Sequence, residues 1–401
     1  MTIISVWKYI FLIYFPLYLC QPSPVIYSSF FCANGYFEIP LYITNHQIQI
    51  TAKISQVSSK NYILNTLFDP QQYITSKQIK NQCTSINVNG KLMDSLIYTD
   101  NIKTENMTQF ISNFLFYSID QNENPELKSN CISLLLDFPT INSTSLVHLM
   151  KQQGLINRLS YTFKNCLYHK SELEFGNEPS MLENVHKCKV DPISYTWNCK
   201  MNSIHIVNDS QSIYAFKYAA SFDVGRNKTT VPCSFIDFLI EKIMNVQFQN
   251  GDCQLFEYDN KKRIQCNDLH TIQKMPSLQI NFEEFSLELK MNTFFACYLY
   301  VYCYSLFKCR KGLENDWVFG SSFIRHFEIT FDYEDKAVLL KSSSYYINIK
   351  ANHNINPQKT IQKEKIPIKY TNLQSIINII NILLIITCLL LLFIKYKLKF
   401  K

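Results

Sequence analysis

One aspartate stands where a buried strand is expected to end. An apolar strand runs into a carboxylate, and a glycine follows two residues later, in Ser221-Phe222-Asp223-Val224-Gly225-Arg226. Burial penalises a charged carboxylate, so such a residue is retained where partners or chemistry compensate. Gly225 permits a turn tight enough to bring backbone groups close to that carboxylate. Asp223 is therefore the first candidate for acid or base chemistry.

Other reaction centres find little support in the sequence. It contains no Gly-x-Ser-x-Gly elbow and no His-Glu-x-x-His helix, and its eight histidines are scattered. No Cys-x-x-Cys pair occurs, and Cys297, Cys303 and Cys309 are too widely spaced for a zinc ribbon or finger. We therefore expect neither a metal nor a cofactor.

The elements that must position Asp223 are predicted to be mainly β. Alternating runs such as Ile48–Ile54, Tyr62–Leu67 and Leu92–Tyr98 are separated by polar turns, which is typical of short strands. After Asp223, the apolar run Phe235–Met244 favours a helix. A chain of 401 residues with 47% hydrophobic content is long enough to bury a large core.

Both ends of the chain carry patterns of membrane targeting. Lys8 precedes the apolar run Tyr9–Leu19, which predicts a signal peptide over residues 1–20, with an uncleaved anchor as the alternative. The apolar stretch Ile376–Ile394 has the length of a transmembrane helix, and alternating lysines follow it. The formal net charge of +7 falls to about +2 without the five lysines of these two ends, so a nucleic-acid partner is not expected.

Cysteine usage agrees with a secretory route. Of 14 cysteines, Cys20 lies in the expected signal and Cys388 in the expected anchor, which leaves an even number between them. Disulfide bonds are the expectation, although spacing alone does not choose their connectivity. The same route is consistent with four glycosylation sequons, at Asn106, Asn142, Asn208 and Asn227.

Several stretches resemble the pepsin-like aspartic proteases. Asp223-Val224-Gly225, followed by Pro232 and the apolar run, is similar to that family's second Asp-Thr/Ser-Gly element, although Val224 and Arg226 depart from it. The run Trp317–Asp332 is similar, without a gap, to the family's Trp-Ile-Leu-Gly-x-x-Phe-Leu-Arg-x-Tyr-Tyr-x-x-Phe-Asp. Cys131–Gly176 resembles the family's succession of a strand, a helix, a Gly-x-Ile turn and two further strands.

The resemblance implies a mainly β, two-lobed fold with an interlobe cleft that binds extended polypeptides. In this family two carboxylates, one from each lobe, hold a water molecule between them and share one proton, because like charges so close cannot both ionise. Both are needed for peptide hydrolysis. The expected organisation is a signal peptide, two lobes, a stalk, a transmembrane helix and a cytoplasmic tail, at residues 1–20, 21–203, 204–345, 346–375, 376–394 and 395–401.

The first catalytic motif, Asp-Thr-Gly-Ser-Ser in the family, is degraded in this chain. One register matches Tyr73-Ile74-Thr75-Ser76 to the family's Trp-Val-Pro-Ser and puts Asn65 at the aspartate position. The other register puts Asp69 there, at the cost of a short deletion. We favour Asn65, which can hold a water molecule but cannot take its proton. Arg226 replaces a small hydroxyl residue, and a cation there would favour ionised Asp223 over a shared proton.

The function expected from this resemblance is that of a membrane-anchored aspartic-type endopeptidase homologue with impaired catalysis. The alternatives are a non-catalytic ectodomain that binds peptide or protein in the same cleft, and a surface scaffold or adhesion domain. In each case the body of the protein is expected in the lumen of the secretory pathway or vacuole, or at the cell surface. Two apposed carboxylates would favour the enzyme, and a single carboxylate the binding protein.

Overall fold

The computed structural model describes most of the chain between residues 25 and 351. The described ranges are 25–31, 37–43, 48–56, 61–64, 70–72, 76–79, 84–88, 91–104, 110–120, 130–134, 145–164, 170–177, 185–190, 196–207, 209–258, 261–298, 302–310, 317–343 and 347–351. Strands dominate these ranges, and the mainly β prediction is confirmed.

The first sheet has 14 strands within the described residues. Its order is β12-β25-β24-β10-β11-β1-β2-β3-β9-β4-β8-β7-β5, and β6 pairs with β7 beside this path. The strands are β1 (Val25–Phe31), β2 (Phe37–Ile43), β3 (Ile48–Ser55), β4 (Tyr62–Leu64), β5 (Lys77–Gln78), β6 (Thr84–Val88), β7 (Lys91–Thr104), β8 (Ile111–Ile119), β9 (Asn130–Ser133), β10 (Ser160–Lys164), β11 (Lys170–Phe175), β12 (His186–Lys189), β24 (Phe327–Asp332) and β25 (Ala337–Ser342).

The second sheet has 12 strands within the described residues. Its order is β20-β21-β17-β22-β15-β23-β14-β13-β18-β19-β26, and β16 pairs with β17 beside this path. The strands are β13 (Asn198–Ile206), β14 (Asp209–Asp223), β15 (Thr229–Thr230), β16 (Cys253–Tyr258), β17 (Lys261–Cys266), β18 (Leu278–Phe282), β19 (Phe285–Leu289), β20 (Phe295–Tyr298), β21 (Tyr302–Ser305), β22 (Phe307–Arg310), β23 (Trp317–Gly320) and β26 (Ile347–Ala351).

Within the described ranges the helices are few and short. They are α2 (Leu146–Gln152), α3 (Cys233–Lys242), α4 (Asn245–Gln249), α5 (Leu269–Gln273) and α6 (Ser321–Ile324), with 3₁₀ turns η1 (Pro70–Gln72) and η4 (Met291–Phe294). The predicted helix after Asp223 is confirmed as α3, which buries Phe235, Ile236 and Leu239. Ser145 caps α2 by accepting a hydrogen bond from the backbone of His148.

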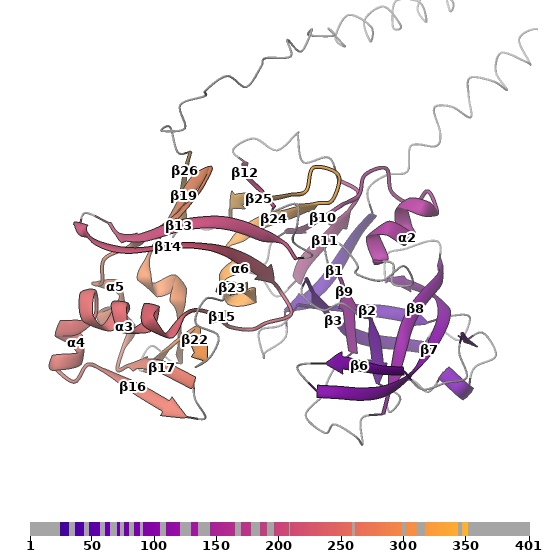
Figure 1. The fold of residues 1–401 in the computed structure, drawn as a ribbon, viewed down its shortest axis with the longest axis horizontal. Coiled ribbons are helices and arrows are strands. Elements are labelled where there is room, and N and C mark those ends of the chain that lie inside the picture. Colours follow the sequence, from indigo (N-terminus) through magenta and orange to yellow (C-terminus); the bar gives the residue numbers. More distant parts are fainter. Residues whose placement is uncertain are drawn as a thin grey trace, which may run out of the picture. The chain divides into compact units, whose positions relative to one another are not determined.

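Two strands from near the end of the chain complete the first sheet. In Figure 1, β24 and β25, in the orange of the late sequence, lie beside β10 and β11. Aromatic rings fill the core behind β24: Phe331 stacks on Tyr161 at 4.9 Å between centroids and meets Trp197 edge-on at 5.1 Å. Both Tyr161 and Trp197 donate hydrogen bonds to the carbonyl of Leu134. These contacts anchor β24, and with it β25, in the core of the first sheet.

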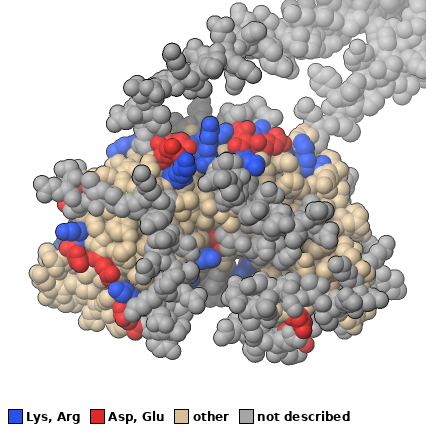
Figure 2. All heavy atoms as spheres, viewed as in Figure 1, with Lys and Arg blue, Asp and Glu red and all other residues tan. Residues whose placement is uncertain are grey.

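Opposite charges alternate above these same strands. Figure 2 shows Lys and Arg side chains between Asp and Glu along the upper edge of the view, where Figure 1 has β10, β24 and β25. Arg158 pairs with the buried Asp332 at 2.6 Å, and Lys164 lies between Glu174 and Glu328. These pairs tie β10, β11 and β24 together across their outer surface.

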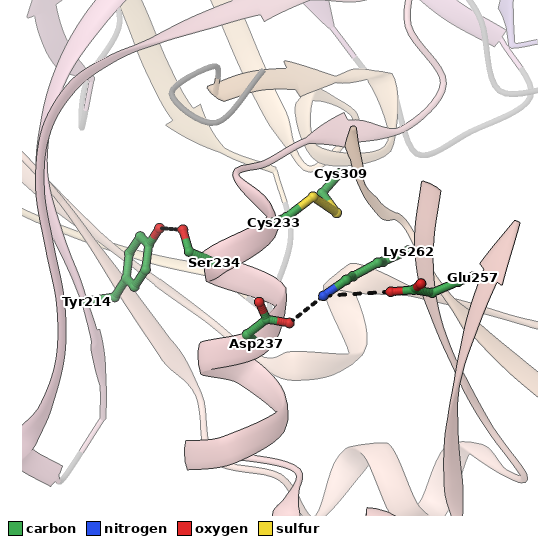
Figure 3. The surroundings of a disulfide bond; sticks show 7 residues. All are labelled: Tyr214, Cys233, Ser234, Asp237, Glu257, Lys262 and Cys309. Carbon is green, nitrogen blue, oxygen red and sulfur yellow. Dashed lines mark hydrogen bonds and ion pairs between the residues drawn. A yellow bond between two sulfur atoms is a disulfide. The ribbon is translucent and has the colours of Figure 1, made fainter. Parts of the chain in front are cut away.

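Four disulfide bonds join described cysteines: Cys188–Cys199, Cys233–Cys309, Cys253–Cys266 and Cys297–Cys303. Figure 3 shows Cys233 at the start of α3 bonded to Cys309 on β22. One turn along α3, Asp237 accepts a hydrogen bond of 2.8 Å from Lys262. The prediction of disulfides is confirmed, and this one fixes the helix that follows Asp223 against the second sheet.

The folded unit continues past the predicted end of the second lobe at residue 345. Residues 347–351, assigned from the sequence to a stalk, form β26 and pair with β19 in antiparallel register. Ile347 is buried in that pairing, so this residue belongs to the core. Within the ranges given above, no helix has the length and apolar character needed to cross a bilayer. The predicted signal peptide and residues 376–394 lie outside the described residues.

Candidate active site

Asp223 is the last residue of β14, as the sequence predicted, and its side chain is buried. The final residues of β14 pair in parallel with β23, with Asp223 opposite Gly320. The preceding residue, Phe222, is fully buried, so β14 holds the Asp223 carboxylate at the end of a strand that packs in the core.

The two carboxylate oxygens of Asp223 have different partners. Oδ1 accepts hydrogen bonds from the Ser55 hydroxyl at 3.1 Å, the Gln56 backbone N–H at 3.2 Å and the Gly225 backbone N–H at 3.1 Å. Oδ2 accepts one from Nε of Arg226 at 3.2 Å. Three donors and one cation therefore surround a single buried carboxyl group, and no second described carboxyl group is among these partners.

Gly225 has to be a glycine because the backbone of β3 lies against it. A Cβ placed there would be 2.6 Å from the carbonyl oxygen of Ile54 and 3.2 Å from Cβ of Ser55. These distances are shorter than van der Waals contact, and one of the atoms belongs to backbone. The tight turn predicted from the sequence is confirmed by the Gly225 backbone N–H, which donates to the Asp223 carboxylate. The approach of β3 in the first sheet to β14 in the second is an additional finding.

Gln56 provides a second link between the two strand ends. Its side-chain Oε1 accepts a hydrogen bond of 2.8 Å from the Val224 backbone, while its own backbone N–H donates to Asp223. Gln56 is fully buried, and its Nε2 has no hydrogen-bond partner. Gln56 therefore links the two strand tips through both its amide side chain and its backbone N–H.

Ser55 and Asp223 hold equivalent places in the two sheets. β3 pairs in parallel with β9 and ends at Ser55 opposite Ser133. β14 pairs in parallel with β23 and ends at Asp223 opposite Gly320. β3 and β14 thus each run parallel to one neighbouring strand of their own sheet. Their last residues, Ser55 and Asp223, are in contact with each other.

The strands that follow extend this equivalence. Seven residues after Ser55, Tyr62 in β4 pairs antiparallel with Cys131, two residues before Ser133. Seven residues after Asp223, Thr230 in β15 pairs antiparallel with Val318, two residues before Gly320. β4 and β15 also each take a parallel neighbour, β8 and β22. The strands around β3 and the strands around β14 therefore share one pattern of pairing. In this pattern the position of Ser55 is equivalent to that of Asp223.

Burial raises the pKa of Asp223 above its ordinary value of 3.8. The guanidinium of Arg226 opposes this rise, as do the hydrogen bonds from Gln56, Gly225 and Ser55. Arg226 does favour the ionised form, as the sequence suggested, but desolvation outweighs it. The arrangement holds one carboxyl group that faces a neutral hydroxyl.

The family model of the eukaryotic aspartyl proteases matches residues 46–342. The chain belongs to this family. The match covers most strands of both sheets and includes Ser55 and Asp223. Comparison with curated proteins returns no match. At the level of the family, the activity is that of an aspartic endopeptidase, with a polypeptide as the substrate, and the four disulfides indicate folding in an oxidising compartment.

The structure of this aspartyl protease homologue does not bring all of the predicted site residues together. Asp223 and Arg226 are in contact. Asn65 and Asp69, the two candidates for the first aspartate position, lie outside the described residues, as do the sequons at Asn106, Asn142 and Asn208. Asn227 is described and half-buried, and its carbonyl accepts a hydrogen bond from Ser322.

Ser55 is the site residue that the sequence reasoning missed. A signal for it does exist, because Ser55-Gln56-Val57-Ser58-Ser59 keeps the last two serines of Asp-Thr-Gly-Ser-Ser. With neither the aspartate nor the glycine present, those two serines alone are a weak signal. Among the described residues, no cluster of three or more histidine, cysteine or acidic side chains could hold a metal ion.

Proposed function

We propose that this aspartyl protease homologue binds polypeptides and does not hydrolyse them. The observation that carries the proposal is the hydrogen bond from the Ser55 hydroxyl to Asp223, at the place where the equivalence of β3 and β14 calls for a second carboxylate. In this proposal Ser55 takes the first aspartate position in place of Asn65 or Asp69. Tyr62 corresponds to Thr230, so the position of Asn65, three residues after Tyr62 in the sequence, corresponds to that of Cys233 at the start of α3. The same register therefore does not match Asn65 to Asp223.

The chemistry of the two groups explains the loss of hydrolysis. A protease of this class needs one ionised carboxylate to take a proton from water and one protonated carboxyl group to donate to the scissile carbonyl. A serine hydroxyl at acidic or neutral pH does neither. The loss of one positioned acid or base costs about 10²- to 10⁴-fold in rate, and more where two groups act as a unit.

Arg226 adds a second obstacle to catalysis. Its guanidinium occupies Oδ2, while three donors occupy Oδ1. A catalytic water would have to compete with these groups for the carboxylate. The same contacts fix the two strand tips, so the scaffold on which a polypeptide could lie is retained without the reaction.

The wider organisation is part of the proposal. We infer two lobes that divide near residue 204, with a cleft between them in which the polypeptide lies extended. The separate sheets that contain β3 and β14 support two lobes, although β24 and β25 return to the first sheet and β26 extends the second past the predicted end at residue 345. We infer further that residues 1–20 are a signal peptide, that 376–394 anchor the chain in a membrane with its body lumenal or extracellular, and that the sequons carry glycans. The apolar runs and the lysines after Ile394 support the anchor.

The test is a hydrolysis and binding assay on the full-length protein in detergent micelles. A mixed peptide library would be incubated from acidic to neutral pH with and without a statine-type transition-state mimic, beside Asp223→Asn. We expect bound peptides and no cleavage in either protein. Cleavage that both the mimic and Asp223→Asn abolish would contradict the proposal.

A gain-of-function variant sharpens this test. Ser55→Asp combined with Arg226→Thr places a second carboxyl group at the strand tip and removes the competing cation. If Ser55 stands at the first aspartate position, this variant should acquire hydrolysis that the statine mimic inhibits. Asn65→Asp with Arg226→Thr is the matched control and should remain inactive.

A further inference from the structure

A group of cations surrounds one tyrosine of the second sheet. Tyr304 lies on β21, and the guanidinium carbon of Arg263 on β17 lies 3.9 Å from the centre of its ring. Nζ of Lys228, five residues after Asp223, lies 5.4 Å from the same centre. We call Lys228, Arg263 and Arg325, together with Tyr304, the Tyr304 cluster.

Arg325 joins the cluster from the C-terminal end of α6. Burial lowers the pKa of Arg325, and the interaction with Tyr304 opposes that effect. Its Nε contacts a ring nitrogen of His326 at 3.5 Å. The cluster is therefore assembled from the loop before β15, from β17, from β21 and from α6. Figure 1 shows β15, β17 and β22 grouped in the second sheet, where β22 pairs with both β15 and β17.

Among the residues that the structure describes, no negative charge balances the cluster. The ion pairs of the described residues include none for Lys228, Arg263 or Arg325, whereas the neighbouring Lys262 is paired with Asp237 at 2.8 Å. Nε of Arg263 is buried and has no hydrogen-bond partner. An aromatic ring attracts a cation but carries no net charge, so Tyr304 does not neutralise three of them.

Like charges held together while half-buried are unfavourable unless an anion joins them. Burial lowers the pKa of Lys228 to about 8, and the charges of Arg263 and Lys308 act in the same direction. Four separate elements nevertheless bring these side chains to one place. A carboxylate or phosphate oxygen could satisfy the unpaired Nε of Arg263 and relieve the repulsion at the same time.

We propose that the Tyr304 cluster binds the carboxylate of an acidic side chain in a polypeptide held at the Asp223 site. The proposal rests on the proposed function, since it assigns a preference to the same ligand. Lys228 connects the two places, because only four residues separate it from the Asp223 carboxyl group and Arg226 lies between them. The preference for an acidic side chain should arise from its charge and from the paired N–H donors of the arginine guanidinium groups, whose geometry matches a carboxylate.

The test uses pairs of nine-residue peptides that differ in one residue. A Glu is moved through an Ala, Val and Gln background, and each peptide has a Gln partner at the same position. Binding to the full-length protein in detergent is measured by fluorescence anisotropy at neutral pH and low salt. At one position of the scan we expect the Glu peptide to bind about tenfold more tightly than its Gln partner.

The variants separate the cluster from general electrostatic attraction. Arg263→Gln and Lys228→Gln should each remove most of the preference for Glu and leave the affinity for the Gln peptide unchanged. Lys200→Gln is the matched control, because Lys200 is 64% exposed and pairs with Glu283 on another part of the sheet. Unfolding curves confirm that each variant is folded, and two independent variants keep the test decisive if one is not.

The possible outcomes distinguish this inference from the proposed function. If neither peptide series binds, the proposed polypeptide binding fails and the inference fails with it. If both series bind equally at every position, polypeptide binding stands and the assignment of the cluster is overturned. Inorganic phosphate provides the last arm: if it raises the unfolding temperature of the wild type and not of Arg263→Gln, while Glu and Gln peptides bind equally, the cluster holds a free anion and the acidic polypeptide is excluded.

Discussion

The hydroxyl of Ser55 donates a hydrogen bond to the carboxylate of Asp223, and the two residues end strands with the same pattern of pairing in two different sheets. In an active member of this family, two carboxyl groups would meet at this point and share a proton. Here the exchange of one acid for a neutral hydroxyl removes the repulsion between them. The pair therefore retains the structural contact between the strand tips without the acid and base that peptide hydrolysis requires.

Replacement of Arg226 should destabilise the protein more at neutral than at acidic pH. Arg226→Gln removes the cation that opposes the desolvation of Asp223, so the pKa of that carboxyl group should rise further. A carboxyl group whose pKa is raised by folding destabilises the folded state increasingly as the pH rises through that pKa. We expect a loss of about 1 to 2 kcal/mol at pH 7, reduced by the 38% exposure of the Arg226 side chain, and a smaller loss near pH 3.

Urea unfolding at the two pH values measures this effect. In the Asp223→Asn background, which has no charge to stabilise, Arg226→Gln should cost much less at pH 7. Equal losses in both backgrounds would show that Arg226 acts through packing rather than through the ion pair.

Gly225→Ala should be among the most damaging small substitutions in the chain. The new Cβ would lie 2.6 Å from the carbonyl oxygen of Ile54, so the tips of β3 and β14 would have to separate. Overpacking of this kind typically costs about 1 to 3 kcal/mol, and it should also weaken peptide binding. Gly154→Ala is the control, since a Cβ at that position would meet nothing within 4 Å. Its only cost would be the backbone strain of an alanine at positive φ. Similar losses in the two variants would refute the close approach as the cause.

The sequence predicted one half of this site well and the other half poorly. Asp223 was found because the apolar strand, the aspartate and Gly225 are all local, and α3 followed from its own apolar run. Ser55 was missed because its role depends on register between distant segments, β3 with β9 and β14 with β23. The local signal, the two serines that close Ser55-Gln56-Val57-Ser58-Ser59, is too weak to place Ser55 without that register. β26 was missed for a similar reason, because its partner β19 lies about 60 residues earlier, and long-range pairing is not visible in composition.

Removal of the Cys233–Cys309 disulfide should cost more stability than removal of Cys297–Cys303. The first closes a segment with a sequence separation of 76 residues and the second one of only 6. The entropy of loop closure in the unfolded chain then gives about 4 kcal/mol for the first and about 2 kcal/mol for the second. Unfolding of Cys233→Ala/Cys309→Ala and of Cys297→Ala/Cys303→Ala under identical conditions compares them. A larger loss of stability on removal of Cys297–Cys303 would contradict this prediction. It would show that the disulfide stabilises the hairpin of β20 and β21 locally and that chain entropy is not the main effect.

His326 should make the protein less stable as the pH falls. Burial lowers its pKa from 6.5 to about 3, and the charge of Arg325 acts in the same direction. Between these two values the unfolded chain binds a proton that the folded chain excludes, so stability is fully retained above about pH 6.5 and is lost progressively toward pH 3. The loss attributable to this one residue should be on the order of a few kcal/mol.

The variant His326→Gln isolates this contribution. A glutamine side chain keeps a hydrogen-bonding group at this position but does not take up a proton. The free energy of unfolding should therefore fall less steeply between pH 6.5 and pH 4 in the variant than in the wild type. His205→Gln, on the partly exposed face of β13, serves as the control and should leave the steeper wild-type slope intact. Parallel slopes for wild type and His326→Gln would mean that the acid sensitivity arises from another residue.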